Sequence, residues 1–99
     1  MSSRPPNSGA RSVELVLYEK PGCHLCDEMK AVVDRVIAQL EGVHAVVRSV
    51  DISLDPELST VYGEQIPVLF VNGRKAFKYQ LTEHDLRDRL KRELAREST

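Results

Sequence analysis

Tryptophan is absent from this sequence of 99 residues, and three tyrosines and two phenylalanines are its whole aromatic content. An aromatic core is therefore excluded, and valine, leucine and isoleucine must supply most of the buried surface. No apolar run approaches the ~18 residues that a membrane-spanning helix needs. Neither sign of charge is in excess, since fourteen basic and fifteen acidic residues give a net charge of −1. We therefore expect no general attraction to nucleic acid or to an anionic membrane.

The first twelve residues lack the apolar stretch of a signal peptide. Their composition predicts a disordered tail over residues 1–12, followed by a single domain over residues 13–96. Because no export signal is seen, we expect a cytoplasmic protein, and we expect it to be a monomer. In the cytoplasm a close cysteine pair is more often catalytic or metal-binding than structural.

The first half of the domain changes from a strand pattern to a helix pattern. Residues 13–18 are almost continuously apolar and predict a central β-strand, which residues 20–22 end. From Cys23 the period becomes helical, and Gly42 is predicted to end this helix. Its apolar stripe comprises Leu25, Met29, Val32, Val33, Val36 and Leu40. Residues 44–51 predict a second strand, and two strands joined by a helix form a right-handed parallel βαβ unit.

The second half begins with a short helix and a hairpin. Asp55 is predicted to cap a helix that starts at Pro56 and stops at Gly63. The apolar residues 67–71 and the residues 75–79, in which apolar and lysine side chains are mixed, then flank Asn72-Gly73, which is the strongest local signal for a β-hairpin. These two strands complete the predicted sheet.

A last helix is predicted after Thr82, which resembles the first residue of a capping box. Leu86, Leu90 and Leu94 lie four residues apart and define its buried face. Acidic and basic residues alternate over residues 87–96, so the rest of this helix is expected to be a solvated face. The order β-α-β-α-β-β-α predicts an α/β protein with a thioredoxin-like fold, in which a four-stranded mixed sheet is flanked by helices.

Two cysteines stand at the predicted start of the first helix, in Cys23-His24-Leu25-Cys26. Residues three apart share one face of a helix, so the two sulfur atoms can approach each other. Unpaired N–H groups and the helix dipole stabilise a thiolate there, and such positions lower a cysteine pKa from ~8.5 to ~3.5–7.5. We expect Cys23 to attack a substrate disulfide and Cys26, one turn further in, to resolve the mixed disulfide. The alternative is a pair of small apolar core residues.

Residues 19–26, followed by residues 62–68 and by Asn72-Gly73, resemble the small glutaredoxin-like family of the thioredoxin superfamily. The resemblance implies a thiol–disulfide oxidoreductase in which a cis-proline loop faces the cysteines. Pro67 matches that proline; the residues alone leave its isomer open, and the resemblance implies cis. It also implies that the backbone of Ile66 pairs with a bound peptide or with glutathione.

Two side chains near the cysteines have open interpretations. Lys20 stands where glutaredoxins usually carry a lysine, so it could stabilise the thiolate, bind a glutathione carboxylate, or be a solvated loop residue. His24 could favour the thiolate when protonated, or point outward with little effect. A zinc site usually needs four ligands, and His44 and His84 lie far away in the sequence, so we expect no metal site.

The match to glutaredoxins breaks in two places. His24 and Leu25 replace the proline and tyrosine of their usual cysteine pair. Residues 78–83 contain no Gly-Gly turn, which binds a glutathione carboxylate in glutaredoxins, and Glu83 would repel a carboxylate there. A glutathione mixed disulfide and a disulfide-containing protein thus stay open as partners, with glutathione or a thioredoxin-type system as reductant and no bound cofactor. An iron–sulfur or metal carrier using Cys23, and a binding module without activity, are the alternative functions.

Overall fold

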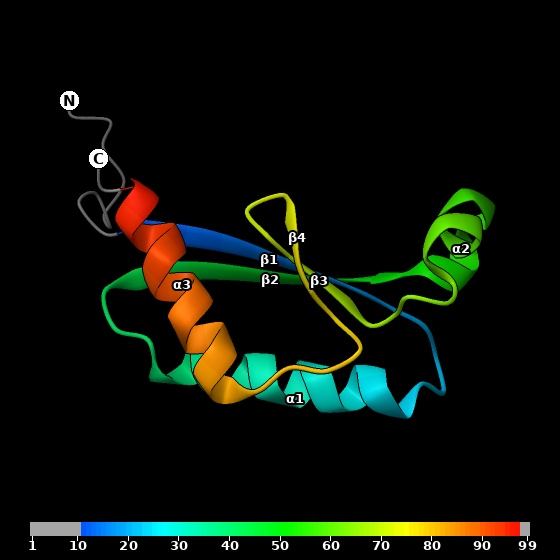
Figure 1. The fold of residues 1–99 in the computed structure, drawn as a ribbon, viewed down its shortest axis with the longest axis horizontal. Coiled ribbons are helices and arrows are strands. Elements are labelled where there is room, and N and C mark those ends of the chain that lie inside the picture. Colours follow the sequence, from blue (N-terminus) through cyan, green and yellow to red (C-terminus); the bar gives the residue numbers. More distant parts are fainter. Residues whose placement is uncertain (1–10, 98–99) are drawn as a thin grey trace.

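Strand β1 (Arg11–Glu19) is an interior strand of a four-stranded sheet whose order is β2-β1-β3-β4 (Figure 1). The computed structural model describes residues 11–97. Strand β1 pairs in parallel with β2 and antiparallel with β3, which forms a hairpin with β4. The other elements are α1 (His24–Gln39), β2 (Val43–Asp51), the 3-10 helix η1 (Ile52–Leu54), α2 (Pro56–Tyr62), β3 (Val68–Val71), β4 (Arg74–Lys78) and α3 (Glu83–Glu97). Apart from η1, these are the elements predicted from the sequence, in the predicted order.

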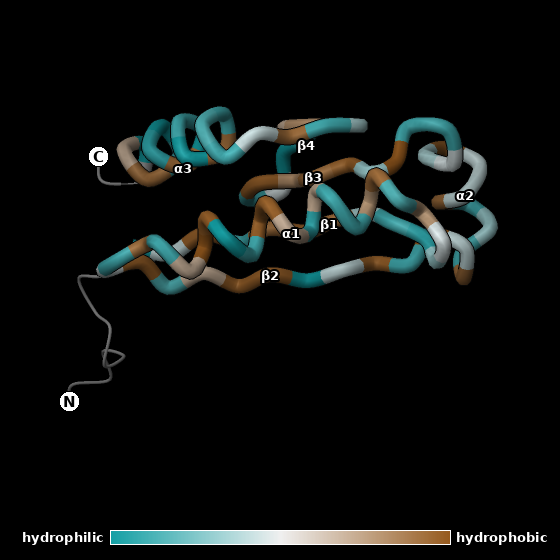
Figure 2. Tube along the Cα trace, turned by 90° about the horizontal axis from the view of Figure 1, so that it is seen from below, coloured by the Kyte–Doolittle hydropathy of each residue, from teal (hydrophilic) through white to brown (hydrophobic). Residues whose placement is uncertain are grey.

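One face of the sheet packs against α1 and α3. Alternate residues of β1 point to these helices and are buried, namely Val13, Leu15 and Leu17. The rest of the core comes from α1, β3 and α3 and comprises Met29, Val33, Val36, Leu69, Val71, Leu86, Leu90 and Leu94. Figure 2 shows hydrophobic residues recurring along α1 at helical spacing. Full burial of one such side chain stabilises the fold by about 1.5–3 kcal/mol, so this layer is the main source of folding free energy.

The other face carries a cluster of three aromatic rings. Tyr18 of β1 and Phe70 of β3 alternate with core residues, and both rings contact Tyr62 of α2. Helix α2 lies at one end of the sheet (Figure 1) and has no buried residue of its own. Its predicted cap is confirmed, because the Asp55 carboxylate accepts hydrogen bonds from two backbone N–H groups and Pro56 occupies the first turn.

The first strand begins earlier than the sequence predicted. Arg11 and Ser12 pair with Val43 and His44 of β2. These two residues therefore belong to the sheet and not to the predicted tail, and residues 1–10 of that tail lie outside the described residues.

Helix α1 begins where the sequence predicted, with Cys23 as its N-cap, but its end and one residue of its buried stripe differ from the prediction. It ends at Gln39, before Gly42, and the Leu40 N–H caps it by bonding to a carbonyl of the last turn. Gly42 instead has a φ of +71° in the turn into β2. Leu25, predicted in the buried stripe, is 40% exposed, and Cys26 occupies the buried face in its place. Successive helical residues differ by about 100°, so Leu25 falls at the edge of the stripe.

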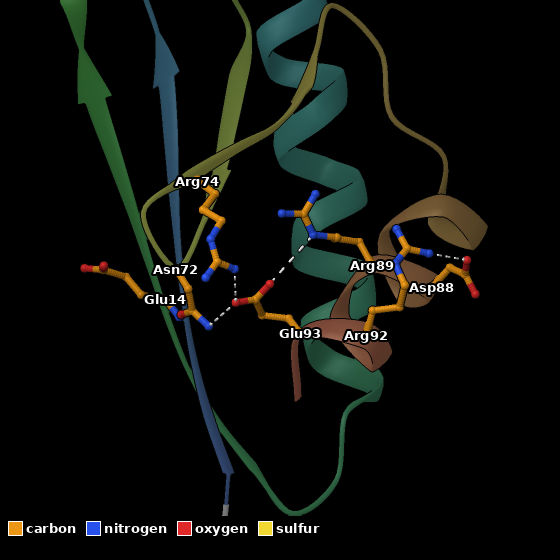
Figure 3. A network of polar contacts seen from close by, with 7 residues as sticks. All are labelled: Glu14, Asn72, Arg74, Asp88, Arg89, Arg92 and Glu93. Carbon is orange, nitrogen blue, oxygen red and sulfur yellow. Dashed lines mark hydrogen bonds and ion pairs between the residues drawn. The ribbon is translucent and has the colours of Figure 1, made fainter. Parts of the chain in front are cut away.

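The predicted solvated face of α3 is wrong at Glu93, which is only 4% exposed. Its carboxylate accepts a hydrogen bond from the Asn72 amide at 3.1 Å and forms ion pairs with Arg74 at 3.3 Å and Arg89 at 3.8 Å (Figure 3). The side-chain oxygen of Asn72 accepts the Glu14 N–H at 2.8 Å. This network joins the end of α3 to the β3–β4 turn and to β1.

We expect Glu93→Ala to lower the free energy of unfolding by about 1–3 kcal/mol, because it leaves partly buried donors of Asn72 and Arg89 without their charged acceptor. Urea denaturation measures this. Asp88→Ala is the control, because the Asp88–Arg92 pair on the same helix is solvent-exposed and should contribute less than about 0.5 kcal/mol. Equal losses in the two variants would contradict the prediction.

Candidate functional site

Cys23 is the N-cap of α1, and Cys26 lies in its first turn. The Sγ of Cys23 accepts a hydrogen bond from the Cys26 N–H, with 3.1 Å between nitrogen and sulfur. The two side chains form a disulfide, and their Cα atoms are 5.2 Å apart. Cys26 is fully buried, whereas Cys23 is partly exposed. The predicted proximity of the two sulfur atoms is confirmed, while their separate roles stay a prediction.

A tight turn between β1 and α1 places Cys23 at the start of the helix. Strand β1 ends at Glu19, and Gly22 has a φ of +75°, a left-handed conformation that favours glycine. The first helical hydrogen bond runs from the Asp27 N–H to the Cys23 carbonyl at 3.1 Å. The Cys26 N–H precedes that bond and is one of the donors without a helical acceptor. This N–H points at the Cys23 sulfur instead, so a thiolate formed at Cys23 would find a hydrogen-bond donor already in position.

The proline loop lies at the same end of the sheet as this turn. Tyr18 and Val68 are register partners in β1 and β3, so the cysteine turn that follows β1 and the loop that precedes β3 leave the sheet together. The Ile66–Pro67 peptide bond is cis, as the family resemblance implied. Pro67 is buried and Ile66 is partly exposed.

Tyr79, which follows β4, is a site residue that no sequence pattern predicted. Its N–H donates to the Pro67 carbonyl at 2.8 Å, and its hydroxyl donates to the Glu64 carbonyl at 3.1 Å. It thus holds the proline loop at two points. Its φ is +72°, which is uncommon for a residue with a large side chain. No local sequence pattern marks such a tyrosine, because glycine or asparagine is the usual residue in this conformation.

Lys20 and His24 are both exposed beside the pair. Lys20 lines a small cleft of about 190 Å³ together with Glu19, Asp27 and Asp51. The His24 side chain is 85% exposed, and its Nε2 lies 2.8 Å from a carboxylate oxygen of Glu28, one turn further along α1. Of the predicted site residues, the two cysteines are therefore joined by a covalent bond, and the side chain of His24 is exposed to solvent.

A second, larger hollow of about 460 Å³ lies along α1. We call it the α1 groove. One wall is formed by residues 79–82, between β4 and α3, and the other by residues of α1, namely Leu25, Glu28, Met29, Ala31, Val32 and Arg35. Leu25, which was predicted to be buried but is exposed, therefore contributes to one wall of this groove.

An ion pair joins α1 to α3 at this groove. The Arg35 Nε donates to Glu83 at 2.6 Å, and Arg87 lies 3.3 Å from the same carboxylate. The hydrogen bond from Arg35, and then that from Arg87, hold the pKa of Glu83 below its ordinary value of 4.5. Glu83 was expected from the sequence only to repel a carboxylate; in the structure its negative charge is paired with two guanidinium groups.

The part of the chain described here offers few groups to a metal. Within residues 11–97, no set of three or more histidine, cysteine, aspartate and glutamate side chains is arranged to hold an ion. A cluster held at Cys23 would therefore need ligands from outside the described residues. No helix in the same range is both long enough and apolar enough to cross a membrane.

A mixed four-stranded sheet with a cysteine disulfide at the start of its first helix defines a thioredoxin-fold protein of the thiol–disulfide redox class. The family described as Glutaredoxin-like domain (DUF836) matches residues 14–91, and the chain belongs to this family. The resemblance predicted from the residues is therefore confirmed. The comparison with curated proteins found no match.

Solved structures agree with this assignment. Protein XcR50 from X. campestris is 31% identical, with a TM-score of 0.64 over 78% of this chain and 95% of that chain. Ne2328 from Nitrosomonas europaea is 26% identical, with a TM-score of 0.61 over 90% and 98% of the two chains. Desulfothioredoxin from Desulfovibrio vulgaris Hildenborough, in its reduced form, is 25% identical, with a TM-score of 0.58 over 89% of each chain. The thioredoxin-like fold is thus confirmed, and these likenesses together with the disulfide support a redox thiol–disulfide function in general.

The Arg35–Glu83 pair should make stability depend on pH on the acid side. The folded pKa of Glu83 is lowered, so its contribution is present above the ordinary value of 4.5 and is lost as the pH falls through the folded value. In Glu83→Gln this contribution is absent throughout. We therefore expect the difference in unfolding free energy between wild type and variant to keep its neutral-pH size down to about pH 4.5 and to shrink as the pH is lowered below that value. Denaturation at a series of pH values measures it, and a difference that does not change below pH 4.5 would refute the assignment.

Proposed function

We propose that this protein is a glutaredoxin-like thiol–disulfide oxidoreductase that works by dithiol–disulfide exchange through Cys23 and Cys26. The observation that carries the proposal is the position of the pair. Cys23 is partly exposed, caps α1 and receives a backbone N–H at 3.1 Å, while Cys26 is buried and bonded to it. In the reduced protein, the partly exposed sulfur would therefore be accessible and, as a thiolate, would accept this N–H, and the other sulfur would lie within reach of it.

The proposed cycle begins with the reduced protein. The Cys23 thiolate attacks one sulfur of a substrate disulfide; that S–S bond breaks, and one substrate sulfur leaves as a thiolate while the other stays bonded to Cys23. Cys26 then loses its proton to solvent and attacks the Cys23 sulfur, which releases the second substrate thiolate. The substrate gains two electrons and takes up two protons through water. The protein keeps the Cys23–Cys26 disulfide, the state seen in the structure.

Four residues around the pair are assigned to substrate binding. The backbone of Ile66, beside Pro67, pairs with an extended segment next to the substrate sulfur. Lys20 and His24 add positive charge near Cys23, His24 only when it is protonated, and a positive charge there favours the thiolate. The exposure of Lys20, His24 and Ile66 supports these roles, because each can meet a partner.

A thiol donor must return the disulfide to the reduced state. Two glutathione molecules, or the dithiol of a thioredoxin-type protein, supply the two electrons. We place the cycle in the cytoplasm, where such donors keep thiols reduced. We propose a monomer, because both cysteines come from one chain.

Cys26→Ser should trap the intermediate. Without the resolving thiol, we expect a mixed disulfide with a disulfide substrate to accumulate at Cys23, and intact mass spectrometry followed by peptide mapping measures it. Cys23→Ser is the matched control and should trap about tenfold less, because the remaining Cys26 is buried. Equal trapping at both cysteines, or at neither, would falsify the mechanism. Partner binding that is equal in the two redox states, without thiol release, would instead indicate a binding module.

A further inference from the structure

We infer that the outward face of α2 docks the protein with which Cys23 exchanges disulfides, and that this partner presents basic side chains around an apolar one. The inference rests on the proposed function and names the chemistry of the partner's surface. Helix α2 contacts the face of the sheet opposite α1, so the docking face is separate from the α1 groove.

The outward face of α2 is apolar and open. Leu54, directly before the cap of the helix, is 81% exposed, and Val61 is 57% exposed. They are the two most exposed large hydrophobic side chains of the residues that the structure describes. The helix also borders a hollow of about 470 Å³, whose lining residues are Pro56, Glu57, Thr60 and Val61. We call these four residues and Leu54 the α2 surface. Apolar side chains gathered in this way mark an interaction surface.

The contacts that hold α2 in place come from its other side. No residue of the helix is buried. The Ser59 hydroxyl donates to the Ile52 carbonyl at 2.7 Å, and the Tyr62 ring contacts Tyr18 and Phe70 of the sheet. Ser59 and Tyr62 are half-buried, whereas every residue of the α2 surface is exposed. A partner can therefore cover the α2 surface without breaking the contacts that fix the helix.

The segment that carries the α2 surface is acidic. Residues 49–73 contain no lysine or arginine, and their carboxylates are Asp51, Asp55, Glu57 and Glu64. Because the whole chain has a net charge of only −1, the rest of the chain is net basic. Lys75 approaches from β4, but it lies over the Tyr62 ring at 5.6 Å, on the side of α2 that faces the sheet. The charge of the α2 surface therefore favours a basic partner.

The α2 surface is connected to the cysteine turn. Strand β2 ends at Asp51, and η1 with Leu54 follows directly. Asp51 also lines the cleft of about 190 Å³ beside the turn that precedes Cys23, and in this cleft Asp51, Glu19 and Asp27 outnumber Lys20. Figure 1 shows α2 at the end of the sheet where α1 starts. A partner whose sulfur is bonded to Cys23 can therefore extend across the acidic cleft to α2.

The same charge selects against other occupants. Nucleic acid and anionic lipid headgroups are repelled by the carboxylates of this segment. A second copy of this chain in a symmetric dimer would place the same acidic face against itself, where like charges oppose each other. A protein with lysine or arginine side chains around an apolar one matches both the charge and the hydrophobicity of the α2 surface.

Two peptides of opposite charge test the site directly. Each has about twelve residues, which span at most ~40 Å when extended, with a terminal cysteine, leucines, and either lysines or glutamates. In the binding measurement serine replaces the cysteine, and the peptides are titrated into isotope-labelled, oxidised protein. We expect the lysine peptide to shift the amide resonances of residues 51–61 and the glutamate peptide to bind about tenfold more weakly or less. The difference should shrink as the salt concentration is raised.

Four variants then test whether the α2 surface affects disulfide exchange. The reduced proteins are mixed with the disulfide-linked dimer of either cysteine peptide or with bis(2-hydroxyethyl) disulfide, and acid quenching with alkylation gives the rate constant of oxidation. Glu57→Lys and Val61→Gln change the α2 surface. Glu41→Lys and Val46→Gln are the matched controls, because Glu41 and Val46 are exposed but lie outside it.

We expect Glu57→Lys and Val61→Gln to lower the rate constant with the lysine peptide by about fivefold or more, while both controls, and every rate constant with the small disulfide, change less than about twofold. Equal binding and equal rates for the two peptides overturn the inference. So do shifts that lie only outside residues 51–61, or a preference for the lysine peptide that both surface variants retain. Normal oxidation by the small disulfide leaves the proposed function standing in each of these cases. If no disulfide oxidises wild type, the proposed function fails and the inference with it.

Discussion

The pairing of β1 on both of its edges is the constraint on which the site depends. Tyr18 is the register partner of Val50 in β2 and of Val68 in β3. Strands β1 and β2 therefore end at the same end of the sheet at which β3 begins. Helix α1 starts at this end, and α2 lies there too (Figure 1). Ladder hydrogen bonds hold neighbouring strands about 4.8 Å apart. The separation of the cysteine turn from the proline loop is thus set by the backbone, before any side chain of the site contributes.

Helix α3 is held at both ends by charged groups, and this bears on the site although α3 carries none of its chemistry. Near its start, Glu83 is bonded to Arg35 of α1, and near its end Glu93 is bonded to Arg74 of the hairpin. Buried leucines lie between these two contacts. The segment between β4 and α3 therefore connects two elements that are both held in place. Their positions fix the position of the groove wall that this segment forms.

Local patterns predicted most of the fold, because the residues that decide it are neighbours in the sequence. Asp55 before a proline caps a helix, and Asn72-Gly73 turns a hairpin, wherever they occur in a suitable context. The cysteine pair was found in the same way. Glu93 could not be found, because it stands in a run of mixed charge and its partner Asn72 is 21 residues away. The positions of Tyr79 and Leu25 could not be predicted for a related reason, because the surfaces to which they contribute form only when the helices and strands pack together.

The unequal burial of the two cysteines restricts the shape of any molecule that exchanges with them. Sulfur exchange proceeds through three sulfur atoms lying close to a straight line. Cys26 occupies the inner end of that line and is closed to solvent, so the incoming sulfur must arrive on the outward extension through Cys23. In the proposed cycle, a disulfide carried on a protruding loop can meet this direction of approach, whereas one recessed in a flat surface is hindered. The shape of the substrate around its disulfide would therefore select substrates, in addition to its reduction potential.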